Sequence, residues 1–546
     1  MLLKLVDLFS FFSVVLRAGT LVFQSVLLGG VLFALWVARA SPEVAPESLG
    51  RVQASTWRLL RIGAVGLVLM QLLYLYVNSA VLMATAEISF SEVIGANFFI
   101  SGCIVLTAAL AILFLASGDH RVSKWTLPLL ALVVMGGSVM TDHAASRLEL
   151  RPLLITLSCI HELATGFWIG GLPFLILGLF RAKDSTTRWY VTERFSRMAL
   201  ASVAALVISG ITMSVIYIGS WGAVLGTSYG VMVLAKATML GALLLLGGLN
   251  FLLIRSARKE DALPCLRRLI EAEVGIGITV ILTAASLTSQ PPAVDQVDDT
   301  LTFSQIYHRV NPVLPRLTYA YVVEPANARK GGAAKPGRLE NNIVRYNVDG
   351  FLLTPVFINN AIESESNHHW MGLVVFIMGV LALLARTGKM PWANYWPLLL
   401  IAIAAFIFIQ ADSECWPVGW KSFGACWIDP EAFQHRIAAL LCAGFGIFEM
   451  RVHRRPYQNE RLALIFPLLA AIGGAVLLTH SHAISNVKES TLVELSHVPM
   501  GVIAVFAGWS RWLELRLPEK NRAIPSFVWP VCFVLIGALL LNYREM

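Results

Sequence analysis

Fourteen apolar runs separated by polar segments constrain the fold of this chain more than any other feature. A helix needs about 20 residues to cross about 30 Å of hydrocarbon, and most of the runs reach or approach that length. The chain is 57% apolar and 14% charged, whereas soluble proteins carry about a quarter charged residues. This composition excludes a soluble, a disordered and a nucleic-acid-binding protein. We predict an all-α polytopic membrane protein with about 14 transmembrane helices, which we expect at residues 9–37, 62–82, 94–117, 125–141, 153–180, 198–219, 229–254, 269–289, 370–385, 393–410, 435–450, 462–480, 495–510 and 525–542.

The positive charges predict how these helices are oriented. The loops after the odd-numbered runs hold 26 of the 42 Lys and Arg residues, among them Arg39, Arg188 and Arg454. Among the opposite loops, 83–93 and 220–228 contain neither Lys nor Arg. Because basic loops stay on the cytoplasmic side, we expect the odd-numbered loops inside and both termini in the periplasm. The chain is then a multi-pass protein of a bacterial inner membrane.

Residues 290–369 are the one long stretch between apolar runs, and long loops cross the membrane whatever their charge. Leu317–Val323 and Asn342–Phe357 have the composition of short strands, and Asp349-Gly350 is typical of a type I′ hairpin turn. We therefore predict an outer loop of about 80 residues that carries a small β element. The expected domains are an eight-helix membrane domain at 1–293, this loop at 294–367, and a six-helix membrane domain at 368–546.

The eleven histidines are distributed unevenly over the expected topology. His120 and His453 fall on the cytoplasmic side and the other nine on the outer side, eight of them near helix ends and His308 in the long loop. Imidazole is the commonest protein ligand for metals such as copper and zinc, so this clustering predicts capture of a metal or of haem. The alternative is that histidine simply tolerates the headgroup zone. The candidate metal ligands are His143, His161, His368, His369, His435, His480, His482 and His497.

A His-Ala-x-Ser motif occurs at corresponding places in the two halves, once at His143 and once at His482. Each motif ends an apolar run that carries a Gly-Gly pair, and a further histidine follows 18 or 15 residues later, at His161 and His497. We expect each of these later histidines to open the next helix. Two imidazoles on neighbouring helix ends can bind one ion, whereas duplication of an ordinary helical hairpin is the alternative explanation.

Other donors lie beside these histidines. Met140 and Met500 can add a thioether, which favours Cu(I), and Asp142 and Glu162 can accept hydrogen bonds from ring N–H groups.

Cysteines and intramembrane charges supply further candidates. Cys415 and Cys426 lie in an outer loop, where a disulfide is the favoured interpretation, followed by metal ligation and by free thiols. Arg17 and Lys236 fall within apolar runs, so each should face the interior of the bundle, either as a functional group or as a structural ion-pair partner.

Motifs for other chemistries are absent from the sequence. It contains no GxxxxGK[ST] nucleotide-binding loop, no Asp-Lys-Thr-Gly, no Cys-Pro-Cys, no Cys-x-x-Cys-His for covalent haem, and no zincin pattern. Any transport is therefore passive or driven by a gradient, without ATP hydrolysis by this chain, and we do not expect an enzyme.

Short motifs occur in a characteristic order over residues 1–293. They are Arg17 with Gly29-Gly30, His143-Ala144-Ala145, His161 through Phe167–Gly171, Arg194-Phe195-Ser196, Leu225–Gly230 with Lys236, Leu266–Arg268 with Glu271 or Glu273, Leu282–Ala284, and Pro291-Pro292. In this order they resemble the CopD copper-resistance membrane protein family, which has an eight-helix inner-membrane fold. The resemblance implies copper tolerance or copper movement from periplasm to cytoplasm, often with a periplasmic copper-binding partner protein. It does not extend to residues 294–546.

The leading interpretation is a copper-handling inner-membrane transporter whose outer histidines collect copper and pass it inward. Two alternatives belong to other classes: a haem b redox protein with paired histidines as axial ligands and quinol as electron donor, and a non-transporting factor that loads copper into a respiratory enzyme.

Overall fold

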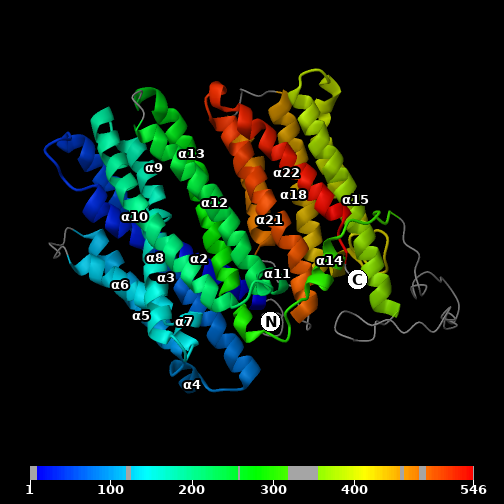
Figure 1. Ribbon diagram of the computed structural model, residues 1–546, viewed down its shortest axis with the longest axis horizontal. Coiled ribbons are helices and arrows are strands. Elements are labelled where there is room, and N and C mark those ends of the chain that lie inside the picture. The colour runs from blue at the N-terminus through cyan, green and yellow to red at the C-terminus, as the bar shows by residue number, and fades with distance from the viewer. Residues whose placement is uncertain are drawn as a thin grey trace. The chain divides into compact units, whose positions relative to one another are not determined.

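The computed structural model describes residues 9–118, 125–255, 259–317, 355–454, 460–478 and 487–544. Throughout these ranges the regular structure is helical (Figure 1), and the one exception is an isolated bridge between Cys415 and Lys421. The chain divides into two compact units between Asp298 and Asp299. Each unit is considered separately below.

The first unit is built around α2, which packs against α3, α6, α8 and α13. Apolar side chains of α2 such as Leu27 and Leu28 are almost fully buried, so this helix forms the centre of the unit. The helices are α2 (Phe9–Leu32) continued by the π-helix η1 (Phe33–Val37), α3 (Pro46–Ala86), α4 (Phe90–Ile94), α5 (Asn97–Ser117), α6 (Thr126–Val139), α7 (His143–Ser146), α8 (Arg151–Trp168), α9 (Leu172–Arg181), α10 (Ser185–Ile218), α11 (Ala223–Gly226), α12 (Ser228–Arg255), α13 (Lys259–Leu287) and the short 3-10 helix η2 (Ala293–Asp295).

The second unit has an aromatic core in which Trp396 and Trp529 are fully buried and their ring centroids lie 5.2 Å apart. The core is formed mainly by α15, α16, α18, α20, α21 and α22. The helices are α14 (Phe303–Val310), α15 (Pro355–Arg386), η4 (Pro391–Tyr395), α16 (Leu398–Gln410), α17 (Phe423–Cys426), α18 (Pro430–Arg454), α19 (Glu460–Ala463), α20 (Ile465–Leu477), α21 (Val487–Arg516), η5 (Glu519–Asn521) and α22 (Ala523–Leu541).

Long apolar helices confirm that the chain is a polytopic membrane protein. Ten helices in the described ranges are long and apolar enough to cross a membrane. Helices α6, α16 and α20 are apolar but only 13 or 14 residues long. All fourteen expected spans contain helix, whereas the number that cross the membrane stays a prediction.

Several helices begin well before the apolar runs from which they were predicted. Helix α10 begins at Ser185 rather than at residue 198, α15 at Pro355 rather than at 370, and α21 at Val487 rather than at 495. The cause is that hydropathy detects only the lipid-facing part of a helix, whereas polar residues continue the same backbone hydrogen bonds beyond it. The predicted strand Asn342–Phe357 is wrong at its end, because Pro355–Phe357 belong to α15. The rest of the predicted β element lies at residues 318–354, outside the described residues.

The fifth expected span is interrupted between α8 and α9, at Ile169–Gly171. Here the backbone of α2 approaches so closely that a Cβ on Gly170 would lie 1.8 Å from the carbonyl oxygen of Ser25. A Cβ on Gly29 of α2 would likewise lie 2.3 Å from the carbonyl carbon of Gly170. Only glycine fits at position 29 of α2 and at position 170 between α8 and α9, and each of these glycines belongs to a Gly-Gly pair.

Loops that the charge alternation places on one face meet at one end of the first unit. The backbone N–H of Lys183 donates to Ser48 Oγ at 3.0 Å, and the hydroxyl of Tyr190 donates to the carbonyl oxygen of Arg39 at 3.0 Å. These contacts join the segment after α2 to the segment after α9. The two segments are those that follow the first and fifth expected spans.

A buried ion network ties four helices of the second unit together. Arg511 of α21 bonds to Glu449 of α18 and, at 2.6 Å, to Glu514 on its own helix. Glu514 also pairs with Arg386 at the end of α15 and accepts a hydrogen bond of 2.6 Å from the indole N–H of Trp529 in α22. Glu449 is fully buried and Arg511 is 4% exposed, so these charges compensate one another inside the protein.

Candidate metal site

A cavity of about 770 Å³ lies inside the first unit. Its wall is mostly apolar, and it is formed by α2, α7, α8, α10, α12 and α13. His143 and His161, the two histidines predicted to share an ion, both line it, and so do Asp142, Glu162 and Lys236. The structure therefore brings these predicted residues to a single cavity.

His143 begins the short helix α7 and lies between two aromatic rings. Its ring centroid is 6.4 Å from that of Tyr217 and 6.5 Å from that of Tyr229. Its Nε2 atom is buried and has no hydrogen-bond partner among the described residues. A buried nitrogen without a partner is costly unless something else binds it, so this atom can accept a ligand.

His161 lies in the middle of α8, about 15 Å along the helix from its first residue. The prediction that it opens the helix is wrong, because α8 already begins at Arg151. Its Nδ1 is 3.1 Å from Ser209 Oγ, and that hydroxyl donates its own hydrogen to the carbonyl oxygen of Ala205 at 2.7 Å. The hydroxyl must therefore accept from the ring, so Nδ1 carries the hydrogen and Nε2 carries the lone pair.

A stripe on α10 adds donors that the sequence reasoning missed. Ser209, Met213 and Tyr217 are spaced four residues apart, so they lie on one face of the helix, and Met213 and Tyr217 line the cavity. The thioether of Met213 accepts a hydrogen bond of 3.7 Å from Ser158 on α8. The four-residue spacing was visible in the sequence, but these residues lie inside an apolar run and contain no histidine. The two methionines that were predicted as thioether donors do not line the cavity. Met140 is 37% exposed, and Met500 packs into the core of the second unit.

Both carboxylates of the cavity have a side-chain partner on α2. Arg17 donates to Asp142 at 2.6 Å. This ion pair agrees with the structural interpretation of Arg17, in which its charge is balanced by a carboxylate. Glu162 accepts a hydrogen bond of 2.7 Å from Gln24. Neither carboxylate has a hydrogen bond from a histidine among the described contacts, so the expected support of the imidazoles by Asp142 and Glu162 is not seen.

Two histidines of the second unit lie close together at Tyr543. The ring centroids of His368 in α15 and His497 in α21 are 6.4 Å apart, and the ring of Tyr543 stacks on His368 at 4.0 Å. The Nδ1 of His368 donates to the carbonyl oxygen of Ser364 at 2.8 Å, and that of His497 to Val493 at 2.9 Å. Both histidines bond the carbonyl four residues earlier, which leaves the lone pair on Nε2 in each case. Both lie within their helices rather than at the start, contrary to prediction.

His435 and His369 differ in what their rings contact. The Nδ1 of His435, in α18, lies 2.8 Å from a carboxylate oxygen of Asp412. The Nδ1 of His369 accepts from the backbone N–H of Arg316 at 2.8 Å, and its Nε2 donates to the carbonyl oxygen of Tyr543 at 2.9 Å. Both nitrogens of this buried ring are thus occupied, and neither is available to a metal.

The remaining predicted ligands, His480 and His482, lie outside the described residues, so their pairing with His497 stays a prediction. Among the described residues, no group of three or more His, Cys, Asp and Glu side chains has the arrangement of a metal site. The rings of His368 and His497 lie close together, but within the described residues no complete ligand set of these side chains is formed.

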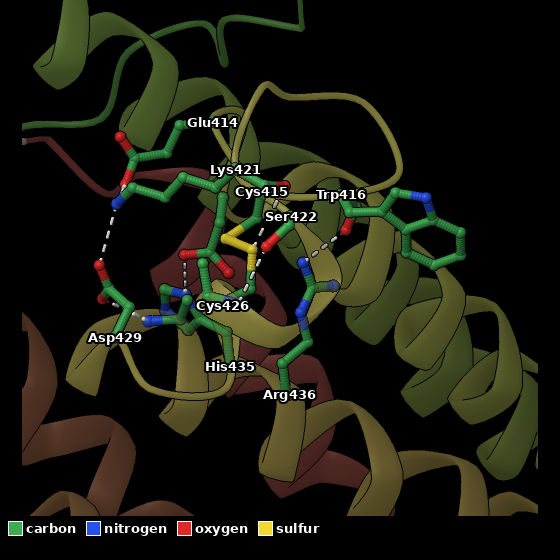
Figure 2. Close-up of a disulfide and its surroundings, with 12 residues drawn as sticks. Glu414, Cys415, Trp416, Lys421, Ser422, Cys426, Asp429, His435 and Arg436 are labelled. Atoms are coloured by element: carbon green, nitrogen blue, oxygen red, sulfur yellow. Dashed lines mark hydrogen bonds and ion pairs between the residues drawn. A yellow bond between two sulfur atoms is a disulfide. The ribbon is translucent and has the colours of Figure 1, made fainter.

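The loop between α16 and α18 is held by a disulfide between Cys415 and Cys426, which is the first of the three interpretations of these cysteines (Figure 2). Lys421 bonds to Glu414 and, at 3.0 Å, to Asp429. These two hydrogen bonds raise the pKa of the Lys421 ammonium, so the loop keeps this charge. Arg436, which is 2% exposed, donates to the carbonyl oxygen of Trp416 at 2.9 Å and so ties the loop to α18.

We expect the Cys415→Ser variant to lose about 3 kcal/mol of stability in this loop, because the disulfide closes a short loop that the unfolded chain would otherwise leave open. The two cysteines are separated by 11 positions. Alkylation of protein from intact cells, with and without prior reduction, measures the bond by mass. A wild-type protein in which both thiols react without reduction would contradict it.

Comparison with known proteins links the first unit to a family. Residues 189–287, which include α12, α13 and nearly all of α10, match the family model of copper resistance protein D, CopD. The resemblance to this family is thereby confirmed. Over 199 residues the chain is 32% identical to the copper transport protein CutJ of Bacillus subtilis, strain 168. That alignment covers 34% of this chain and 36% of CutJ, so little more than a third of either protein is matched. No solved structure matches the chain.

Proposed function

We propose that this polytopic membrane protein, which matches CopD over residues 189–287, handles copper ions and moves them across a bacterial inner membrane. The name of CutJ, copper transport protein, supports the same substrate. In this proposal copper is the transported ion and the chain is a transporter rather than an enzyme.

The observation that carries the proposal is the way the histidines are oriented. In His161, His368 and His497, the Nδ1 hydrogen is donated to an oxygen of the protein itself. This bond fixes the tautomer in which Nε2 has the lone pair, and it holds the ring in place. Metal-bound histidines have the same arrangement, because the second nitrogen almost always donates to a nearby oxygen. The repetition of this bond in both units favours binding over simple tolerance of the headgroup zone.

The donor set of the first unit suits a soft ion. We propose that His143, His161 and the thioether of Met213 bind copper in the cavity. Imidazole and thioether together favour Cu(I) over hard cations such as Mg²⁺ or Ca²⁺. Lys236 and the pair of Arg17 with Asp142 lie at the same cavity and set its charge. A copper ion that enters would therefore meet neutral donors together with a compensated ion pair, the ammonium of Lys236 and the carboxyl group of Glu162.

In the second unit we propose His368, His435 and His497 as copper ligands, together with His480 and His482 as the sequence predicts. His369 is left out because both of its ring nitrogens are occupied. A haem between His368 and His497 is not favoured, since the ring of Tyr543 stacks on His368 and also packs against His497 at 5.7 Å. A flat macrocycle needs that space.

The orientation belongs to the proposal as well. We place the basic loops in the cytoplasm, both termini in the periplasm, and the disulfide loop on the periplasmic side, where an oxidising compartment maintains such bonds. Copper then arrives at the outer ends of the helices, either as the free ion or from a periplasmic copper-binding protein.

The proposal is tested by copper movement in sealed proteoliposomes that contain the purified full chain. We expect copper supplied under reducing conditions to accumulate inside these vesicles faster than in protein-free vesicles, without ATP. Equal copper content in the two preparations would contradict transport. The visible spectrum of the same dithionite-reduced protein is a second readout, because sharp haem bands would favour the redox alternative.

A further inference from the structure

A second set of buried polar groups lies in the first unit, outside the cavity. Glu273 is in the middle of α13 and is 3% exposed. Its Oε1 atom has no hydrogen-bond partner among the described residues. Asn250 of α12 is 6% exposed and lies beside Glu273, close enough for its amide to interact with the carboxyl group, and its amide has no other hydrogen-bond partner within the described residues. Such groups are rare in the membrane and mark functional sites when they occur.

These groups lie near the cavity that contains His143 and His161. Gly277, which lines the cavity, is one helical turn from Glu273 along α13, about 6 Å. On α12, a Cβ added to Gly247 would lie 3.1 Å from Oε1 of Glu273 and 3.9 Å from the indole of Trp168. Trp168 itself lines the cavity. Gly247 therefore lies close both to the carboxyl group and to an indole that lines the cavity, and glycine at this position leaves that carboxyl its space.

No ion pair forms at Glu273 among the described residues, although charged side chains occur on each of the helices packed against it. Helix α13 packs against α12, α2 and α9. On these helices Arg17 pairs with Asp142, Lys236 lines the cavity, Arg255 lies over the ring of Phe251, and Arg181 ends α9 at the basic end of the unit. On α13 itself, Arg268 pairs with Glu271 at 2.5 Å, and Arg267 donates to the carbonyl oxygen of Leu179 at 2.5 Å.

The chemistry of the two side chains favours a proton over a metal. A carboxylate and one amide offer too few oxygens to replace the shell of a hard cation, and neither group is a soft donor for Cu(I). An isolated carboxylate in such a place is costly, whereas a neutral carboxylic acid is not. The amide of Asn250 has both a donor and an acceptor, so it can hydrogen-bond the group in either protonation state.

We propose that Glu273, with Asn250 beside it, is a proton-binding site through which copper movement in the first unit is coupled to proton release. This inference rests on the proposed copper function. When a copper ion leaves the cavity past Trp168 and approaches Glu273, the O–H bond of the Glu273 carboxyl breaks and its proton leaves to water. The carboxylate that remains then balances one positive charge of the ion. When the ion has left, the carboxylate takes a proton from water, and no oxidant or reductant is needed.

The proton itself is tested without copper. The infrared spectrum of the purified full chain should contain the carbonyl band of a protonated carboxylic acid that disappears in Glu273→Gln. The matched control is Glu271→Gln, two residues away on the same helix and paired with Arg268, which should leave the band in place. Asn250→Leu should shift the band without removing it, because the hydrogen-bonding amide is lost. A spectrum of Glu273→Gln identical to wild type in this region would overturn the proposal.

Coupling is tested by proton release, measured with a pH indicator when Cu(I) is added to the same preparations. We expect release in wild type and in Glu271→Gln, together with a Cu(I) affinity that rises with pH, and the loss of both the release and this pH dependence in Glu273→Gln. Undiminished release in Glu273→Gln would overturn the coupling. If wild-type protein binds no copper, the copper function fails, whereas the infrared band still decides whether Glu273 holds a proton.

Discussion

His161→Ala should lower the affinity of the purified protein for Cu(I) by at least 10–100-fold. Loss of a group that merely supports a metal ligand typically costs about this much, and loss of the ligand itself should cost no less. His161 is the histidine whose tautomer is fixed by Ser209 on a neighbouring helix, so its Nε2 is the best-oriented donor of the cavity. Competition with a chromophoric Cu(I) chelator measures the affinity, and copper accumulation in proteoliposomes should fall in parallel.

Two variants separate ligation from packing. His308→Ala removes an exposed histidine of α14 and should leave the affinity unchanged, provided that membrane levels match. His161→Met keeps a bulky side chain with a soft sulfur donor and should retain more Cu(I) affinity than His161→Ala. The assignment of His161 as a ligand fails if the alanine variant binds and accumulates copper as the wild type does.

Arg511→Ala should destabilise the second unit by about 3–5 kcal/mol, the cost of removing one partner from a buried ion pair. The substitution removes the arginine that bonds to the fully buried Glu449. It also removes one of the two arginines that bond to Glu514. Arg511 also lies over the ring of Trp529, with its guanidinium carbon 5.0 Å from the ring centroid, so packing is lost as well. Thermal unfolding in detergent, followed by intrinsic fluorescence, measures the effect.

The matched control is Arg451→Ala. Arg451 is an exposed arginine two residues after Glu449 on α18, and its removal should change stability by less than about 1 kcal/mol. An unfolding temperature of Arg511→Ala equal to that of Arg451→Ala would show that the network does not hold the helices together.

The helices were predictable from sequence because crossing a membrane requires long apolar runs, and α2, α5 and α12 coincide closely with their predicted ranges. Helix starts were not predictable, because α15 and α21 begin with segments rich in polar residues, which an apolar run does not include. This error matters for the site, since it placed His368 and His497 at helix ends instead of within the helices.

Part of the candidate site was predictable because histidine within an apolar sequence is conspicuous. Lys236 and Arg17 were found in the same way, as charges in apolar runs. Met213 was missed because a methionine in an apolar helix resembles its neighbours, and only the fold shows that it lines the same cavity as His161. His369 was predicted as a ligand, but both of its ring nitrogens are occupied by the backbones of Arg316 and Tyr543. These contacts could not be predicted, because the two residues are distant from His369 in the sequence.

The most direct test of the central claim is X-ray absorption spectroscopy of the purified full chain loaded with Cu(I). The account predicts a shell of nitrogen at about 2.0–2.1 Å, as for other imidazole-bound metal ions. It also predicts the outer scattering that an imidazole ring produces, and a sulfur shell that disappears in Met213→Leu. In His161→Ala the imidazole scattering should weaken. A spectrum with oxygen neighbours only, unchanged by His161→Ala and Met213→Leu, would contradict copper binding by the histidines of this membrane protein.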